Sequence, residues 1–116
     1  MKATKTYNLE ERTYEFARDS RQLIYKLPKT ISNIEDGKQL VKSSGSIGAN
    51  YIEANEKLGE KDLKFRLKIL RKEAKESKYW LRLLKDFNTD YASEIETLVV
   101  EVDELRKILS SIINKV

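Results

Sequence analysis

The 116-residue chain has no cysteine and no histidine, and it has only one proline and four glycines. Without cysteine it can form neither a disulfide nor a thiolate metal site. Without histidine it lacks the most common general base and the most common metal ligand of proteins. We therefore expect no catalytic residues, no metal, no cofactor and no enzymatic activity. The scarcity of proline and glycine favours long regular elements over loops.

Long hydrophobic runs are also missing. No stretch approaches the roughly 20 apolar residues that a membrane span needs, and no secretory hydrophobic region follows Met1. We therefore expect a cytoplasmic protein that does not contact a membrane. The length predicts a single domain over residues 1–116, and a hydrophobic content of 40% is enough for a core.

The apolar residues that are present recur at spacings of three and four, which is the period of a helix and not of a strand. Four such segments are predicted, at about 9–27, 33–58, 60–87 and 91–115. Asn8 with Glu11 and Ser32 with Glu35 resemble N-terminal capping pairs. The breaks are short, so the pattern predicts an all-α, up-down-up-down antiparallel four-helix bundle.

The segment 33–58 is rich in small residues. Each of its glycines lowers helix stability by about 1 kcal/mol relative to alanine, so a compensating close contact is expected. We predict that a neighbouring helix approaches closely at Ser43, Ser44, Gly45, Gly48 and Ala49.

The segment 60–87 carries a row of cations beside its apolar seam. The row consists of Lys61, Lys64, Lys68, Arg71, Lys75, Lys78, Arg82 and Lys85, and no acid interrupts it. Residues 61–87 hold ten Lys or Arg and four Asp or Glu, a net charge of +6. The row is either a solvated helix face or a phosphate-binding surface for nucleic acid. Tyr79 and Trp80 lie next to it and are expected to pack in the core or in an interface between copies.

Two further patterns bear on assembly and chemistry. Ser46, Asn50, Glu53 and Lys57 form a polar line, interpreted as a structural network in which Asn50 bonds across to the third helix. Half of a ligand or metal site is the alternative, but di-iron bundles use histidine. The apolar residues Val99, Val100, Ile108 and Ile113 lie off the seam of the last helix, which indicates self-association.

The stretch SIGANYIEA, from Ser46 to Ala54, resembles the SIPANIAEG-type motif of a four-helix bundle family. That family comprises the 23S ribosomal RNA intervening-sequence proteins and the accessory variability determinant of diversity-generating retroelements. The resemblance covers residues 12 to about 86. The matching positions are Ser46, Ile47, Ala49, Asn50 and Glu53 of the motif and Arg71, Glu76 and Leu81 of the third helix. Gly48, Ala54 and the pair Lys72–Glu73 depart from the family pattern.

The resemblance implies a homo-oligomer, typically a ring of five, with a basic surface. In the retroelement branch it also implies nucleic-acid binding and association with a reverse transcriptase. It adds Glu76 to the structural network of Ser46, Asn50 and Glu53, and it leaves Arg71 free to pair with Glu53 instead of a phosphate.

Two functions follow as hypotheses. The first is a non-enzymatic homo-oligomer that binds the RNA or DNA backbone through its basic helix face, with an accessory role beside a larger enzyme such as a reverse transcriptase. The second is a structural or protein-interaction scaffold that binds no nucleic acid.

Overall fold

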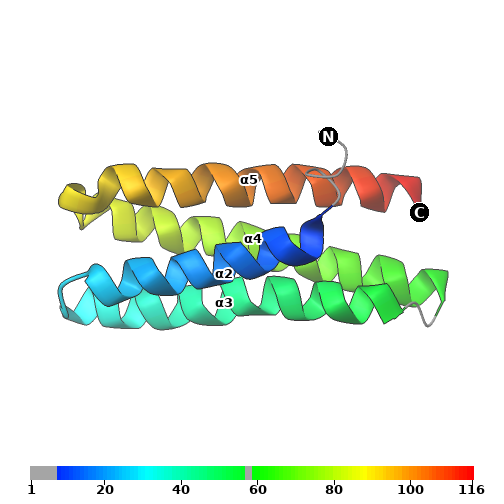
Figure 1. The fold of residues 1–116 in the computed structure, drawn as a ribbon, viewed down its shortest axis with the longest axis horizontal. Coiled ribbons are helices and arrows are strands. Elements are labelled where there is room, and N and C mark those ends of the chain that lie inside the picture. Colours follow the sequence, from blue (N-terminus) through cyan, green and yellow to red (C-terminus); the bar gives the residue numbers. More distant parts are fainter. Residues whose placement is uncertain (1–7, 57–58) are drawn as a thin grey trace.

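Four α-helices form the protein in a computed structural model that describes residues 8–56 and 59–116. They are α2 (Leu9–Lys26), α3 (Ile31–Glu56), α4 (Glu60–Asp86) and α5 (Ala92–Lys115), and a short 3-10 helix, η1 (Thr89–Tyr91), precedes the last. Successive helices run in opposite directions (Figure 1). No strand occurs in the two described ranges. The predicted all-α, up-down-up-down four-helix bundle is confirmed.

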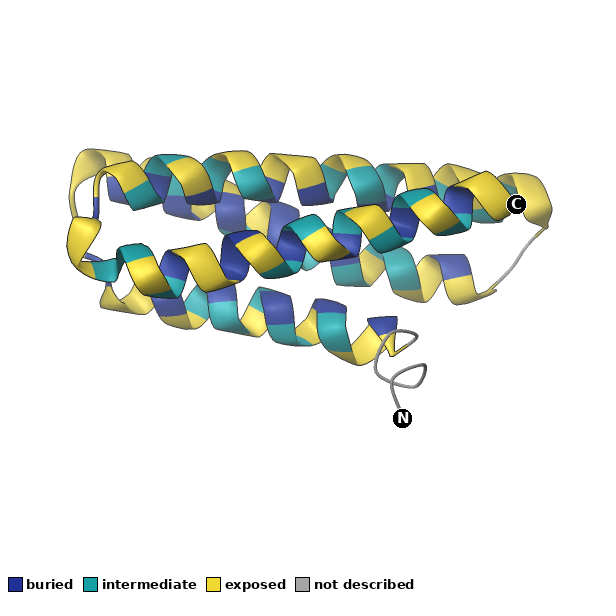
Figure 2. Cartoon of the chain, turned by 90° about the horizontal axis from the view of Figure 1, so that it is seen from above, coloured by how far each residue is buried: buried dark blue, intermediate teal, exposed yellow. Residues whose placement is uncertain are grey.

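Each helix turns one side inward, and these sides form one apolar core (Figure 2). Phe16, Leu40, Leu70 and Leu105 represent the four helices in it, and each is at most 1% exposed. Full burial of a side chain of this size contributes about 1.5–3 kcal/mol. The heptad spacing of the apolar residues therefore selects both the helices and their inner sides.

The helix ends agree with the predicted breaks to within two residues where the structure describes them. Leu27 is extended, with a ψ of 145°, because Pro28 disfavours helical geometry in the residue before it. The predicted cap at Ser32 is wrong, because α3 already begins at Ile31. The side chain of Thr30 caps α3 instead, because Thr30 Oγ1 accepts a hydrogen bond of 3.2 Å from the backbone N–H of Asn33.

The other predicted cap also lacks its side-chain bond. Asn8 does precede α2, but its side chain makes no capping hydrogen bond. At the start of α4, Gly59 has a φ of 138°, a conformation that residues with a side chain rarely adopt. The glycine is therefore required for the chain to reverse direction between α3 and α4.

The small residues of α3 do allow close approach, mainly by α2. A Cβ atom at Gly48 would lie 3.4 Å from Thr13 Oγ1, and one at Gly45 would lie 3.1 Å from Arg21 Nη2. Ser43 faces the other neighbour, and its hydroxyl accepts a buried hydrogen bond of 2.7 Å from Ser77 of α4. Ala49 is exposed, so the predicted contact does not extend to it.

Two connections, α2–α3 and α4–α5, lie together at one end of the bundle (Figure 1). Asn33 and Asn88 join them by exchanging two hydrogen bonds of 2.8 Å between their side-chain amides. Both residues are buried. Asn33 also donates to the Pro28 carbonyl, and Asn88 also donates to the Leu84 carbonyl. The pair thus fixes one end of the bundle through a fully bonded polar contact.

An ion-pair cluster connects α2 to α5, the helices that are first and last among these four. Arg12 Nη2 lies 2.8 Å from Glu101 Oε1 and 2.7 Å from Glu104 Oε1. The hydrogen bond to Glu101 is the main cause that raises the pKa of Arg12. Arg12 therefore stays charged and holds the two helices together.

The wide apolar stripe of α5 has a simpler cause than the predicted self-association. Val99 and Ile113 belong to the core of this bundle, and Ile108 packs against that core. Only Val100 is well exposed, at 57%. The helix α5 therefore does not present a second apolar face.

Candidate nucleic-acid interface on helix α4

The eight predicted cations of α4 divide into two groups by exposure. Arg71, Lys78 and Lys85 are partly buried. The other five are exposed, namely Lys61, Lys64, Lys68, Lys75 and Arg82. The division follows the helix geometry, since the three partly buried residues are seven apart and lie on one flank.

That flank faces α5, which supplies partners for all three residues. Lys78 Nζ lies 3.1 Å from Asp103 Oδ1, and Lys85 Nζ lies 2.7 Å from Glu96 Oε1. Arg71 donates a long hydrogen bond of 3.5 Å to Ser110 Oγ. Two of the eight charges are therefore neutralised by acids that the sequence of α4 alone does not show.

Asp103 is the centre of this contact. Its carboxylate also accepts hydrogen bonds from Arg106, and Lys107 lies 3.6 Å away. The hydrogen bond from Lys78, followed by those from Arg106, lowers the pKa of Asp103. Lys78 thus forms an ion pair with Asp103 at neutral pH, and this pair competes with phosphate binding at Lys78.

The five exposed cations make no ion pair or hydrogen bond with any other residue that the structure describes. They extend from Lys61 to Arg82, which is about 32 Å along a helix that rises 1.5 Å per residue. They form the candidate interface, and we refer to them as the free cations of α4.

Sequence reasoning missed part of this surface. Lys72 is also exposed, and so are two aromatic residues, Phe65 and Tyr79. Tyr79 was expected in the core or in an interface between copies; it is 56% exposed and therefore lies outside the core. Trp80 is partly buried against the core, as expected. The signal was available, because Phe65, Lys72 and Tyr79 repeat the spacing of the basic row one position further around the helix.

The predicted polar network is smaller than expected and centres on Asn50. Its side-chain amide donates to Ser46 Oγ at 3.0 Å and to the Ser46 carbonyl at 2.9 Å. Across the helix interface, Arg66 Nη1 donates to Asn50 Oδ1 at 3.5 Å. Arg66 also forms a long ion pair with Asp62, at 3.7 Å. Arg66 was not among the predicted members, although its spacing from Asp62 could have indicated it.

Glu53 and Glu76 lie outside the network. Both are exposed, and neither bonds to another described side chain. The suggested pair of Arg71 with Glu53 is absent from the described contacts, because Arg71 turns toward α5. The expected partner Lys57 lies outside the described residues.

Glu73 and Glu76 are neighbouring carboxylates of α4. Burial is the first cause that raises the pKa of Glu73, and the neighbouring Glu76 raises it further. Lys72 and Lys42 lower the pKa of Glu73.

Within residues 8–56 and 59–116, no group of three Asp, Glu, His or Cys side chains could hold a metal ion. None of the described helices is long and apolar enough to cross a membrane.

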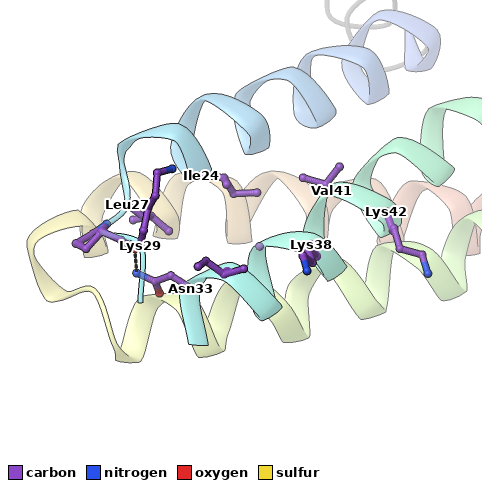
Figure 3. Close-up of a pocket in the computed structure, with 10 residues that line it drawn as sticks. Ile24, Leu27, Lys29, Asn33, Lys38, Val41 and Lys42 are labelled. Carbon is purple, nitrogen blue, oxygen red and sulfur yellow. Dashed lines mark hydrogen bonds between the residues drawn. The ribbon is translucent and has the colours of Figure 1, made fainter. Parts of the chain in front are cut away.

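One groove lies between α2 and α3 near the connection that joins them (Figure 3). It has a volume of about 510 Å³ and an apolar lining that includes Ile24, Leu27 and Val41. Around these side chains lie Lys29, Lys38 and Lys42 (Figure 3). Lys38 also forms an ion pair with Glu35, in which Lys38 Nζ lies 3.6 Å from Glu35 Oε2. Sequence reasoning did not predict this groove.

Comparisons with known proteins add a family and a structural neighbour. A family model described as 23S rRNA-intervening sequence protein matches residues 5–111. A crystal structure from Bacteroides thetaiotaomicron, described as a protein with unknown function from the S23 ribosomal protein family, has a TM-score of 0.78. It is 30% identical, over 90% of this chain and 96% of that chain. No curated protein matches.

Proposed function

This chain belongs to the 23S rRNA-intervening sequence protein family, and on that premise we propose that it is a non-enzymatic homo-oligomer that binds the RNA or DNA backbone through α4. The observation that carries the proposal is the set of free cations, Lys61, Lys64, Lys68, Lys75 and Arg82. All five are exposed and unpaired among the described residues, and all lie on one side of one helix. A linear array of this kind matches a phosphate backbone.

The expected binding is electrostatic and largely independent of sequence, because lysine and arginine at heptad spacing contact phosphates and not base edges. Five contacts predict a slope of about −3.5 to −4.5 for the logarithm of affinity against the logarithm of salt concentration. Raising the salt from about 50 mM to 200 mM should therefore weaken binding by two to three orders of magnitude per protomer.

Self-association would repeat the array in each copy. Support for it comes from the resemblance and from exposed apolar residues outside α5, such as Tyr14 and Ile52, which line a second groove between α2 and α3. Several arrays on one particle would add through multivalency. Light scattering at micromolar concentration tests this part, and a stable monomer would contradict it. An accessory role beside a reverse transcriptase rests on the resemblance alone.

The binding test is a charge reversal at three free cations, Lys64→Glu, Lys68→Glu and Lys75→Glu. Arg71 is left intact because it contacts Ser110. The matched control reverses Lys29, Lys38 and Lys42, which changes the net charge equally but at the groove between α2 and α3. The α4 variant should lose binding to labelled RNA while its circular dichroism is unchanged. Equal binding by wild type and the α4 variant would refute the proposal.

A protein-interaction scaffold is the second candidate, and the groove of Figure 3 favours it. Three lysines around an apolar floor are complementary to an acidic segment of a partner protein that carries an apolar anchor residue. A labelled amphipathic peptide of glutamate and leucine is the probe. Under this candidate the Lys29, Lys38 and Lys42 variant loses the peptide, and the α4 variant retains it.

A further inference from the structure

The exposed side of α4 carries two aromatic rings, each flanked by cations at the same spacing. Reading along the helix, the exposed residues at spacings of four and three are Lys61, Phe65, Lys68, Lys72, Lys75, Tyr79 and Arg82. All seven are exposed, and no acid is among them. We call this set the outer stripe. Its two halves repeat one unit, in which an aromatic residue has a cation four residues before it and another three residues after it.

Tyr79 shows what this unit places together. Lys75 and Arg82 are one helical turn away on either side, so both lie on the same face as the ring. The ring of Trp80 contacts that of Tyr79 in a T-shaped arrangement, with centroids 4.9 Å apart and planes at 79°. Because Trp80 is anchored against the core, this contact restrains the tyrosine while leaving it 56% exposed.

Phe65 repeats the arrangement near the start of the helix. It is 60% exposed, with Lys61 and Lys68 one turn away on either side. The two rings are 14 residues apart in sequence, or about 21 Å along the axis. More than half of each side chain is open to solvent, so both rings can contact an external partner from within the basic stripe.

The ligand that fits both groups is a nucleic-acid strand with accessible bases. Cations bind its phosphates, while an exposed ring can stack on a base. In a duplex the base faces are covered by their neighbours, so the rings contribute only when the bases are unpaired. We propose that the outer stripe prefers single-stranded RNA or DNA, with Tyr79 and Phe65 as stacking platforms. This inference rests on the proposed function and adds the class of substrate.

The test compares one double variant with a matched control. The variant is Phe65→Ala with Tyr79→Ala, and the control is Tyr25→Ala with Phe87→Ala, two exposed aromatic residues outside α4. The probes are labelled oligouridylate of about 16 nucleotides and an RNA hairpin with the same number of phosphates. The stripe variant should lose about tenfold in affinity per ring for the single strand. Its affinity for the hairpin should stay within a factor of about two, and the control should match wild type for both probes.

The tryptophan provides a second, direct readout. Trp80 is the only tryptophan of the chain and touches the Tyr79 ring. Stacking on Tyr79 should change its fluorescence when oligouridylate binds to wild type, and Tyr79→Ala should remove the change.

The outcomes separate the two proposals. Equal losses for strand and hairpin, or no loss for either, would overturn the single-strand inference while leaving backbone binding in place. Dissociation of the oligomer in the stripe variant, with parallel loss of both probes, would assign the rings to an interface between copies and overturn the inference as well. If wild type binds neither probe at low salt, the proposed function itself fails.

Discussion

Replacing Asn88 with alanine should destabilise the bundle by about 3 kcal/mol, because it breaks the hydrogen bonds of the buried amide pair that Asn88 forms with Asn33. The substitution removes three side-chain bonds: the two exchanged with Asn33 and the one donated to the Leu84 carbonyl. A net contribution of about 1 kcal/mol for each bond gives the estimate. Asn33→Ala also removes three bonds, because it loses its contact to the Pro28 carbonyl. Each single variant should thus melt roughly 10 °C lower.

The double variant distinguishes this pair from two independent sites. It removes four bonds in total, so it should cost about 4 kcal/mol and not the sum of about 6 kcal/mol. The interaction energy between Asn33 and Asn88 is then about −2 kcal/mol, well above the 0.3–0.5 kcal/mol scatter for independent residues. A domain usually has 5–15 kcal/mol of stability, so all variants should remain folded for the measurement.

Urea unfolding at neutral pH and one fixed protein concentration measures all four corners of this cycle. Asn55→Ala is the control, because Asn55 is exposed on the same helix as Asn33. It should change stability by less than about 0.5 kcal/mol. Additive costs for Asn33→Ala and Asn88→Ala would refute the reasoning, since they would mean that the reciprocal bonds do not hold the two connections together.

Three other predictions follow from single contacts. Gly48→Ala should stabilise the bundle by about 0.5–1 kcal/mol in thermal unfolding, because its Cβ would meet Thr13 at ordinary contact distance and alanine favours the helix; a lower melting temperature would contradict this. Asp103→Asn should lower the free energy of unfolding at neutral pH, because the hydrogen bond from Lys78 lowers the pKa of Asp103 and stabilises its charged form. The difference in stability between wild type and variant should vanish in acid, because the ion pair is lost as the pH falls through that lowered pKa. Glu73→Gln should raise stability at neutral pH, because burial raises the pKa of Glu73. The folded state therefore disfavours the ionised form, and the gain should grow as the pH rises above the ordinary glutamate value of about 4.3; a pH-independent difference would contradict the assigned cause.

The helices and the core could be predicted from sequence because the period of apolar residues determines them locally. Leu40 and Leu70 are core residues by spacing alone, and Pro28 predicts the end of α2 through its own geometry. The contact between Asn33 and Asn88 could not be found in this way. It joins positions 55 residues apart, and asparagine beside a turn is ordinary turn chemistry.

The candidate site was predicted in part for a similar reason. The heptad pattern of α4 defines its buried side, but it does not reveal which neighbour packs against each flank. Because α5 covers the flank of α4 that carries Lys78 and Lys85, acids of α5 form ion pairs with these two lysines. The solvent-exposed surface of α4 is therefore centred one position further around the helix than the predicted basic row, where Phe65 and Tyr79 lie. Predicting that shift requires the arrangement of all four helices.

The amide pair between the two connections also has a consequence for the order of folding. Helices α3 and α4 are neighbours in sequence and make the most extensive contact between any two described helices, so this hairpin should form quickly from its short connection. Asn33 and Asn88 lie at the open end of that hairpin, 55 residues apart in sequence, so they meet last as it closes. Their bonds are therefore expected to be absent from the transition state, so that losing them speeds unfolding and leaves the refolding rate nearly unchanged. The lifetime of the folded bundle is then controlled at this end of the molecule, separately from the rate at which the fold is reached.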